Sequence, residues 1–157
     1  MVLQIVRAFV VVAAMFSILN ANQIEVIADN FYANEKAGFG ELVGNVLIKK
    51  GKSDTLKASR VKIYFDNNRQ PYKYEAIDDA KFAILLNDKN YNGSGNLLIY
   101  EPKTQIYTLK GNAFLHEIDS DKKVFGDEII VDQLNGIYNV KSKNKEPVKF
   151  IFQVDEK

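Results

Sequence analysis

The sequence predicts an all-β protein, a twisted antiparallel β-jellyroll of solenoid character in which two facing sheets are built from internal repeats. Runs rich in Val, Ile, Phe, Tyr and Leu alternate with turns rich in Gly, Asn, Asp and Lys, as in sandwiches, barrels and solenoids. No window after residue 22 shows helical apolar spacing with capping residues. The expected strands are the apolar runs 24–27, 31–33, 39–48, 56–65, 72–76, 80–86, 97–100, 105–109, 113–118, 128–133, 137–141 and 148–154.

Two stretches of the chain, 42–48 and 109–115, both read Leu-x-Gly-Asn followed by three apolar residues. A degenerate third copy stands at Asp79-Ala80. Such periodic self-similarity indicates an internal duplication. A second unit, a small residue followed by a polar one, recurs at Ala28-Asp29, Ala58-Ser59, Gly95-Asn96 and Gly126-Asp127. We expect bulges or tight corners at these units, where a bulky Cβ would collide.

The repeats also indicate which side chains face inward. Apolar or aromatic residues stand three and five positions after each small residue, and side chains two apart share one face of a strand. If the Gly-Asn unit is a bulge with one extra residue, the residue three positions after its first member also faces inward. The residues expected to line the interior are Ile24, Val26, Phe31, Leu47, Val61, Ile63, Phe65, Phe82, Leu98, Tyr100, Phe114, Ile129 and Val131.

The first 21 residues differ in kind from the rest. Arg7 is their only charge, and it precedes an apolar run that ends near the small residue Ala21. This order is typical of a signal peptide. We therefore expect cleavage after Ala21, although Leu19 departs from the preferred site, and one domain over 22–157. The alternative, an uncleaved anchor, needs about 20 apolar residues, and Arg7 shortens the run. Both alternatives export the remainder.

Composition excludes several classes of function. A net charge of +1 gives no field that would attract nucleic acid, and the absence of Cys removes disulfides, thiol catalysis and Cys-based zinc sites. His116 is the only histidine and has no convergent partners in the repeat pattern. Residues 119–121 lack the later glycine and glutamate of a calcium loop, and residues 92–95 suggest a turn. We expect no enzyme activity, no catalytic residue, no metal and no cofactor.

The leader and the ordered repeats together resemble the OstA/LptA family of periplasmic lipopolysaccharide transport proteins. The residues that carry the resemblance are 24–29, Gly44-Asn45-Val46, Ala58-Ser59-Arg60-Val61, Gly111-Asn112-Ala113 and Gly126-Asp127-Glu128-Ile129. The departures are Ser59, where the family usually has Asp, and Asp79-Ala80, which replaces Gly-Asn. The resemblance implies a jellyroll whose interior holds the acyl chains of lipid A. It also implies head-to-tail stacking with further copies and with related domains of inner-membrane and outer-membrane partners.

The expected function is therefore that of a periplasmic carrier of lipopolysaccharide. An apolar track shields acyl chains, whose exposure costs about 0.8 kcal/mol per methylene. The terminal strands expected at 24–28 and 148–154 either pair within the monomer or add to the sheet of a neighbouring subunit. One alternative is a membrane-anchored component of the same pathway. The other is a surface or adhesion β-sandwich that binds no lipid, whose interior would be packed shut.

Overall fold

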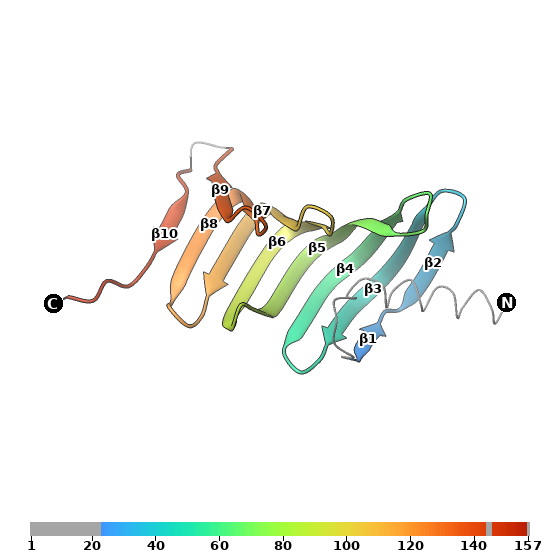
Figure 1. The fold of residues 1–157 in the computed structure, drawn as a ribbon, viewed down its shortest axis with the longest axis horizontal. Coiled ribbons are helices and arrows are strands. Elements are labelled where there is room, and N and C mark those ends of the chain that lie inside the picture. The colour runs from blue at the N-terminus through green and yellow to red at the C-terminus, as the bar shows by residue number, and fades with distance from the viewer. Residues whose placement is uncertain (1–22, 144–145, 157) are drawn as a thin grey trace.

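The computed structural model describes residues 23–143 and 146–156, and the regular elements of these residues are all β-strands. Ten strands form one antiparallel sheet in the order β1-β3-β4-β5-β6-β7-β8-β10, with β2 also paired to β3 and β9 to β8 (Figure 1). The strands are β1 (Ile24–Ile27), β2 (Asn30–Asn34), β3 (Phe39–Lys50), β4 (Asp54–Phe65), β5 (Pro71–Leu86), β6 (Lys89–Glu101), β7 (Ile106–Glu117), β8 (Lys122–Asp132), β9 (Ile137–Lys141) and β10 (Lys149–Ile151). The all-β antiparallel prediction is confirmed, but one continuous sheet replaces the two separate ones. The leader expected at 1–21 lies outside the described residues.

Several strands are longer than the sequence suggested. The runs expected at 72–76 and 80–86 are both parts of β5, and those expected at 105–109 and 113–118 are both parts of β7. Residues 92–95, expected to form a turn, lie inside β6. The polar residues between the apolar runs bend these strands without ending them, because ladder pairing resumes on both sides of each register shift.

The bends are bulges with two consecutive left-handed residues. Gly44 and Asn45 have φ of 81° and 47°, and Gly111 and Asn112 have φ of 75° and 48°. In β5 the same geometry occurs at Asp78 and Asp79, with φ of 60° and 51°. The bulge in β5 therefore begins at Asp78, one residue before the Asp79-Ala80 pair expected from the sequence. The register of β3, β5 and β7 against their neighbours shifts at these three sites.

A polar residue of the neighbouring segment, Asp29 between β1 and β2 or Asn96 in β6, lies against each glycine bulge. A Cβ added at Gly44 would stand 2.3 Å from Oδ2 of Asp29, and one at Gly111 would stand 2.6 Å from Nδ2 of Asn96. The backbone N–H of Asp29 donates to the carbonyl of Gly44 at 2.9 Å, and Nδ2 of Asn45 donates to Oδ2 of Asp29 at 2.9 Å. The absence of a glycine side chain thus lets two strands approach at the corner.

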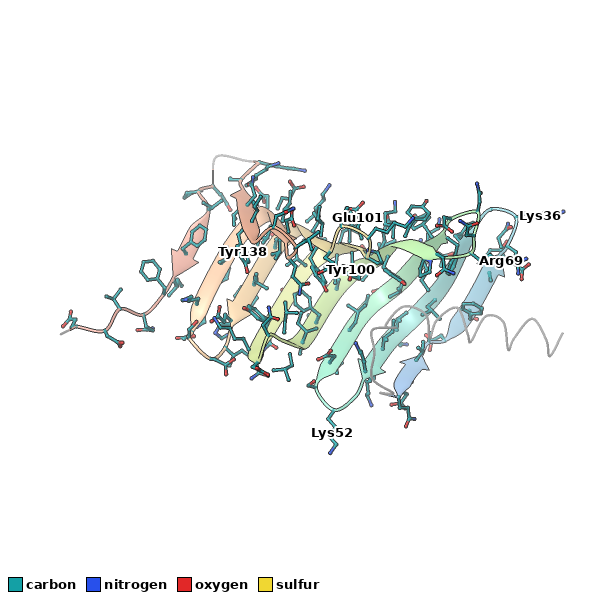
Figure 2. The ribbon with its side chains drawn as sticks, viewed as in Figure 1. Lys36, Lys52, Arg69, Tyr100, Glu101 and Tyr138 are labelled. Carbon is teal, nitrogen blue, oxygen red and sulfur yellow. The ribbon has the colours of Figure 1, made fainter. Side chains whose placement is uncertain are left out.

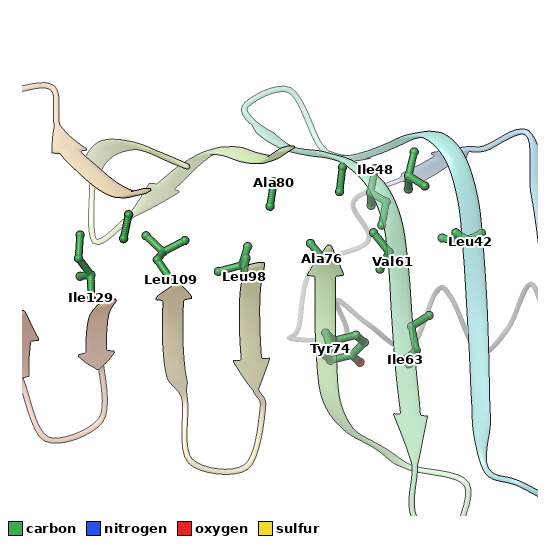
Figure 3. Packing of buried hydrophobic residues seen from close by; sticks show 13 residues of the cluster. Leu42, Ile48, Val61, Ile63, Tyr74, Ala76, Ala80, Leu98, Leu109 and Ile129 are labelled. Carbon is green, nitrogen blue, oxygen red and sulfur yellow. The ribbon is translucent and has the colours of Figure 1, made fainter. Parts of the chain in front are cut away.

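The bends let the sheet cover itself. Val61 and Ile63 in β4 are 0% exposed, although the described part of the chain contains no other regular element that could cover the sheet. Such burial requires the two halves of the sheet to face each other, and in Figure 3 Ala80 projects from one layer toward the buried side chains of the other. The residues buried between the halves are Leu42, Val46, Ile48, Ala58, Val61, Ile63, Tyr74, Ala76, Ala80, Leu98, Leu109, Ala113 and Ile129.

Candidate functional site: the interior of the folded sheet

The strand register places the inward side chains in rows that cross the sheet from one edge to the other, and three rows carry no charged residue. The first row is Phe31, Leu42, Val61, Ala76, Leu98, Leu109, Ile129 and Val140. The second is Ala33, Gly40, Ile63, Tyr74, Tyr100, Tyr107, Val131 and Tyr138. The third, on the other side of the bulges, is Val26, Ile48, Leu56, Phe82, Gly93, Leu115, Val124 and Phe150.

Most of the residues expected to line the interior belong to these rows. Those on the inward face are Val26, Phe31, Val61, Ile63, Phe82, Leu98, Tyr100, Ile129 and Val131, and Phe65 also packs against the core. Ile24 pairs with Lys50 in the ladder, and its side chain lies outside the described part of the structure. Contact of any of these side chains with a lipid remains a prediction.

Leu47 and Phe114 lie on the outer face, so their expected inward placement is wrong. Leu47 stands opposite Lys57 in the ladder, while its neighbours Val46 and Ile48 are 2% and 1% exposed. Likewise Ala113 is buried and Phe114 is not. The reason is that each bulge contributes two left-handed residues rather than one extra residue. The alternation of faces is therefore unchanged across the bulge, and the second residue after each glycine turns inward.

Several interior residues were missed, among them Tyr74, Tyr107 and Ala80. For Tyr107 a signal was available in the sequence, because Tyr107 and Leu109 alternate along the strand up to the bulge glycine Gly111. Tyr74 and Ala80 lie around Asp78, where no glycine marks the bulge. The inward side chains next to the bends are small or short. They are Val46, Ala58, Ala80 and Ala113. A larger side chain at one of these positions would hold the two halves of the sheet apart.

The interior is closed at its centre and exposed at both edges of the sheet. Val61 and Ile63 are wholly buried, whereas Phe31 at the N-terminal edge is 43% exposed. At the C-terminal edge Tyr138 is 65% and Phe150 is 55% exposed. Exposed apolar side chains that adjoin one another mark a surface that binds another molecule. The rows therefore form an apolar track that is packed in the middle and accessible at the ends.

A comparison with known families bears directly on this arrangement. The model of the family described as "LptA/(LptD N-terminal domain) LPS transport protein" matches residues 25–137. The chain belongs to this family. Among solved structures, LptH from Pseudomonas aeruginosa, described as the LptA-homologous periplasmic component of the lipopolysaccharide transport device, superposes with a TM-score of 0.69. The match covers 84% of this chain and 96% of that chain at 18% identity, which shows a common fold. No curated protein matches the chain.

The LptA-type family is not enzymatic, and the charged groups discussed below lie on the outer face and in the turns. The hydroxyl of Tyr64 donates to Oε2 of Glu75 at 2.9 Å, and burial together with this bond raises the pKa of Tyr64 to about 12. His116 lies on the outer face beside Asp121, 2.9 Å away. The turn residues Lys52 and Arg69 point away from the sheet (Figure 2). Within 23–143 and 146–156, no group of three His, Cys, Asp or Glu residues could hold a metal.

The described residues also contain no helix with the length and hydropathy needed to cross a membrane.

Proposed function

We propose that this member of the LptA family carries lipopolysaccharide through the periplasm with the acyl chains of lipid A held between the two halves of the folded sheet. The observation that carries the proposal is the set of three adjoining uncharged rows that run from one edge of the sheet to the other. Each shielded methylene contributes about 0.8 kcal/mol, so several acyl chains supply ample free energy for transfer out of water. The sugar headgroup remains in water.

The closed centre sets the order of events in loading. Acyl chains first meet the exposed inward side chains at an edge, such as Phe31 or Phe150. They reach the central strands when the two halves separate there, because Val61 and Ile63 leave no exposed surface. The halves are joined by single bends at the bulges, so separation changes dihedral angles near the bulges and leaves the ladder hydrogen bonds in place.

The two edges of the sheet support an assembly role. At one edge β1 and β2 act as one bent strand beside β3, and at the other β9 and β10 do the same beside β8. One side of each edge strand is unpaired within the described chain, and unpaired edges bind further strands by main-chain hydrogen bonds. We propose that copies stack head to tail through these edges, and that related domains of inner-membrane and outer-membrane partners dock on the two ends.

The leader and the repeats belong to the same proposal. Residues 1–21 are the signal that directs residues 22–157 to the periplasm, and the recurring bulges of the sheet arose by internal duplication. An uncleaved leader would make the chain an anchored component of the same pathway. Mass spectrometry of the mature N-terminus distinguishes the two, since cleavage after Ala21 leaves a chain that begins at residue 22.

A sandwich that binds no lipid is the second candidate, and the packed centre around Val61 favours it. Photocrosslinking in bacterial cells that make lipopolysaccharide decides between them. A photoreactive phenylalanine analogue replaces Phe31 or Phe82 on the inward face, and Phe114 on the outer face serves as the matched control. The carrier predicts lipopolysaccharide adducts from Phe31 and Phe82 and none from Phe114. Adducts from Phe114 alone, or from no site in folded protein, would reject the carrier.

A further inference from the structure

Three tyrosines stand side by side in the middle of the second inward row. Tyr74, Tyr100 and Tyr107 are cross-strand partners on β5, β6 and β7. The ring centroids of Tyr74 and Tyr100 are 6.0 Å apart with 16° between the planes, and those of Tyr100 and Tyr107 are 4.4 Å apart with 23°. Their rings therefore form one stack across three central strands, with Ile63 and Val131 at its two ends.

The hydroxyl of Tyr74 is buried without a hydrogen-bond partner. Tyr74 is 7% exposed, and its phenolic oxygen is the one fully buried side-chain polar atom without a partner among the described residues. The hydroxyls of Tyr100 and Tyr107 interact with each other. Burial raises the pKa of all three tyrosines, so the hydroxyls keep their protons and act as neutral donors.

Packing alone gives no reason for these hydroxyls. Phenylalanine would form the same stack, and a buried hydroxyl with no acceptor destabilises the protein relative to an apolar group of the same shape. The residues that flank the stack in the row, Ile63 and Val131, have no acceptor side chain. An unpaired buried donor on a row that runs the length of the track indicates a missing acceptor, and the track is where the proposed cargo lies.

We propose that Tyr74, with Tyr100 and Tyr107 beside it, forms a polar binding site inside the apolar track and donates a hydrogen bond to a carbonyl oxygen of the acyl linkages of the bound lipid. The proposal rests on the proposed function and adds to it the chemistry that the interior recognises. A purely apolar track would bind hydrocarbon in any position. Hydroxyl groups that lie in one row of the track fix the position along the track at which the ester or amide end of each acyl chain binds.

A matched pair of lipids tests this site. The full chain, purified after export, is mixed with equal amounts of two phosphatidic acids, one with two tetradecanoyl chains in ester linkage and the other with two tetradecyl chains in ether linkage. Only the ester lipid has carbonyl oxygens. Native mass spectrometry of the complexes gives the ratio of bound lipids directly. One net hydrogen bond predicts about a five- to tenfold preference for the ester lipid.

Tyr74→Phe is expected to bring this ratio close to one while ether-lipid binding stays unchanged and thermal stability stays equal or rises. Tyr64→Phe, on the outer face, is the matched control and keeps the preference. Tyr107→Phe provides a second variant on the row if Tyr74→Phe fails to fold. Equal ratios in wild type and Tyr74→Phe would overturn the tyrosine site and leave the carrier standing. Binding of neither lipid, together with no crosslinks from Phe31 and Phe82, would overturn both.

Discussion

The aromatic ring of Phe82 lies over Gly93 on the neighbouring strand, in the space that a side chain at position 93 would occupy. A Cβ added at Gly93 would stand 2.3 Å from both Cε1 and Cζ of Phe82 and 3.2 Å from the carbonyl oxygen of Phe114. The two residues are direct cross-strand partners on the inward face of β5 and β6. Glycine at 93 is therefore required for packing, since its φ is not left-handed.

Gly93→Ala should destabilise the protein by about 1–3 kcal/mol, the usual cost of overpacking a core. A loss of stability would point to the collision with the ring, because alanine in a strand interior is otherwise more stable than glycine. Urea denaturation measures the change. Phe82→Leu removes the ring atoms that collide, so the double variant should recover part of the loss. A Gly93→Ala protein as stable as wild type, or a double variant with additive losses, would show that the ring is free to move aside.

The bulge in β5 differs from its two counterparts in a correlated way. At Gly44 and Gly111 the neighbouring Asp29 and Asn96 occupy the place of a Cβ. In β5 the equivalent residue is Asp78, which has a Cβ. The shorter Ser59 of β4 lies in the matching stretch of the neighbouring strand, between the pairs Lys57–Lys81 and Arg60–Ile77. A longer side chain at 59 and a Cβ at 78 thus compete for one space. We therefore expect the two departures from the family pattern to be coupled.

A double-mutant cycle tests this coupling. Ser59→Asn should destabilise the wild type by about 1 kcal/mol, and Asp78→Gly should stabilise it by up to about 1 kcal/mol by relieving left-handed strain. In the Asp78→Gly background, Ser59→Asn should be neutral or stabilising, because it recreates the arrangement of Asn96 and Gly111. Asparagine is chosen at position 59 because, unlike aspartate, it adds no charge there. Additive effects in thermal or urea unfolding would refute the coupling.

The acid sensitivity of the fold should depend on Glu117 at the turn between β7 and β8. Its carboxylate accepts hydrogen bonds from Oγ of Ser120 at 2.7 Å and from Nζ of Lys89 at 3.0 Å. The Ser120 bond, and then Lys89, hold the pKa of Glu117 below its ordinary value of 4.5. The unfolded chain regains the ordinary value. The stabilisation is therefore complete above pH 4.5 and is lost as the pH falls through the lower folded-state pKa.

Glu117→Gln should accordingly lower the free energy of unfolding near pH 7 and change it little at about pH 3. Urea denaturation at the two pH values measures the difference. Glu35→Gln, at an exposed position between β2 and β3, is the control and should leave the pH dependence unchanged. A loss for Glu117→Gln of the same size at both pH values would mean that the carboxylate acts by shape and not by charge.

The sequence predicted the strand content and most of the inward face because both follow from alternation. Val61, Ile63, Leu98 and Ile129 stand at fixed distances from small residues, and the ladder keeps those distances. Leu47 and Phe114 were misplaced because the geometry of the Gly-Asn bulge depends on backbone dihedral angles that residue types do not determine. Asp78 shows the same limit, since its left-handed φ of 60° is unusual for a residue with a side chain.

The stacked tyrosines and the single folded sheet were beyond reach for a related reason. Tyr74 and Tyr107 are separated along the chain, and their alignment with Tyr100 follows from the register of three strands. The sheet is likewise continuous because the residues before and after each bulge pair with the same neighbouring strand. Contacts of this kind are properties of pairing between distant segments.

The proposed head-to-tail stacking of subunits requires two different edges at every contact. Phe31 is exposed at the N-terminal edge and Phe150 at the C-terminal edge, and a lysine at either site adds charge to an edge that would otherwise bind a strand. In head-to-tail stacking every contact uses one edge of each kind, so Phe31→Lys and Phe150→Lys should each remain monomeric in sedimentation velocity at concentrations where wild type associates.

Mixing the two variants in equal amounts should restore association, but only as far as a dimer. The intact C-terminal edge of Phe31→Lys meets the intact N-terminal edge of Phe150→Lys, and the two remaining edges both carry lysine. Like-with-like pairing of edges predicts the opposite, since one of the variants would then dimerise alone. Circular dichroism of each variant confirms that the sheet is intact. Monomers in the mixture, or a dimer of either variant by itself, would exclude head-to-tail contact through these edges.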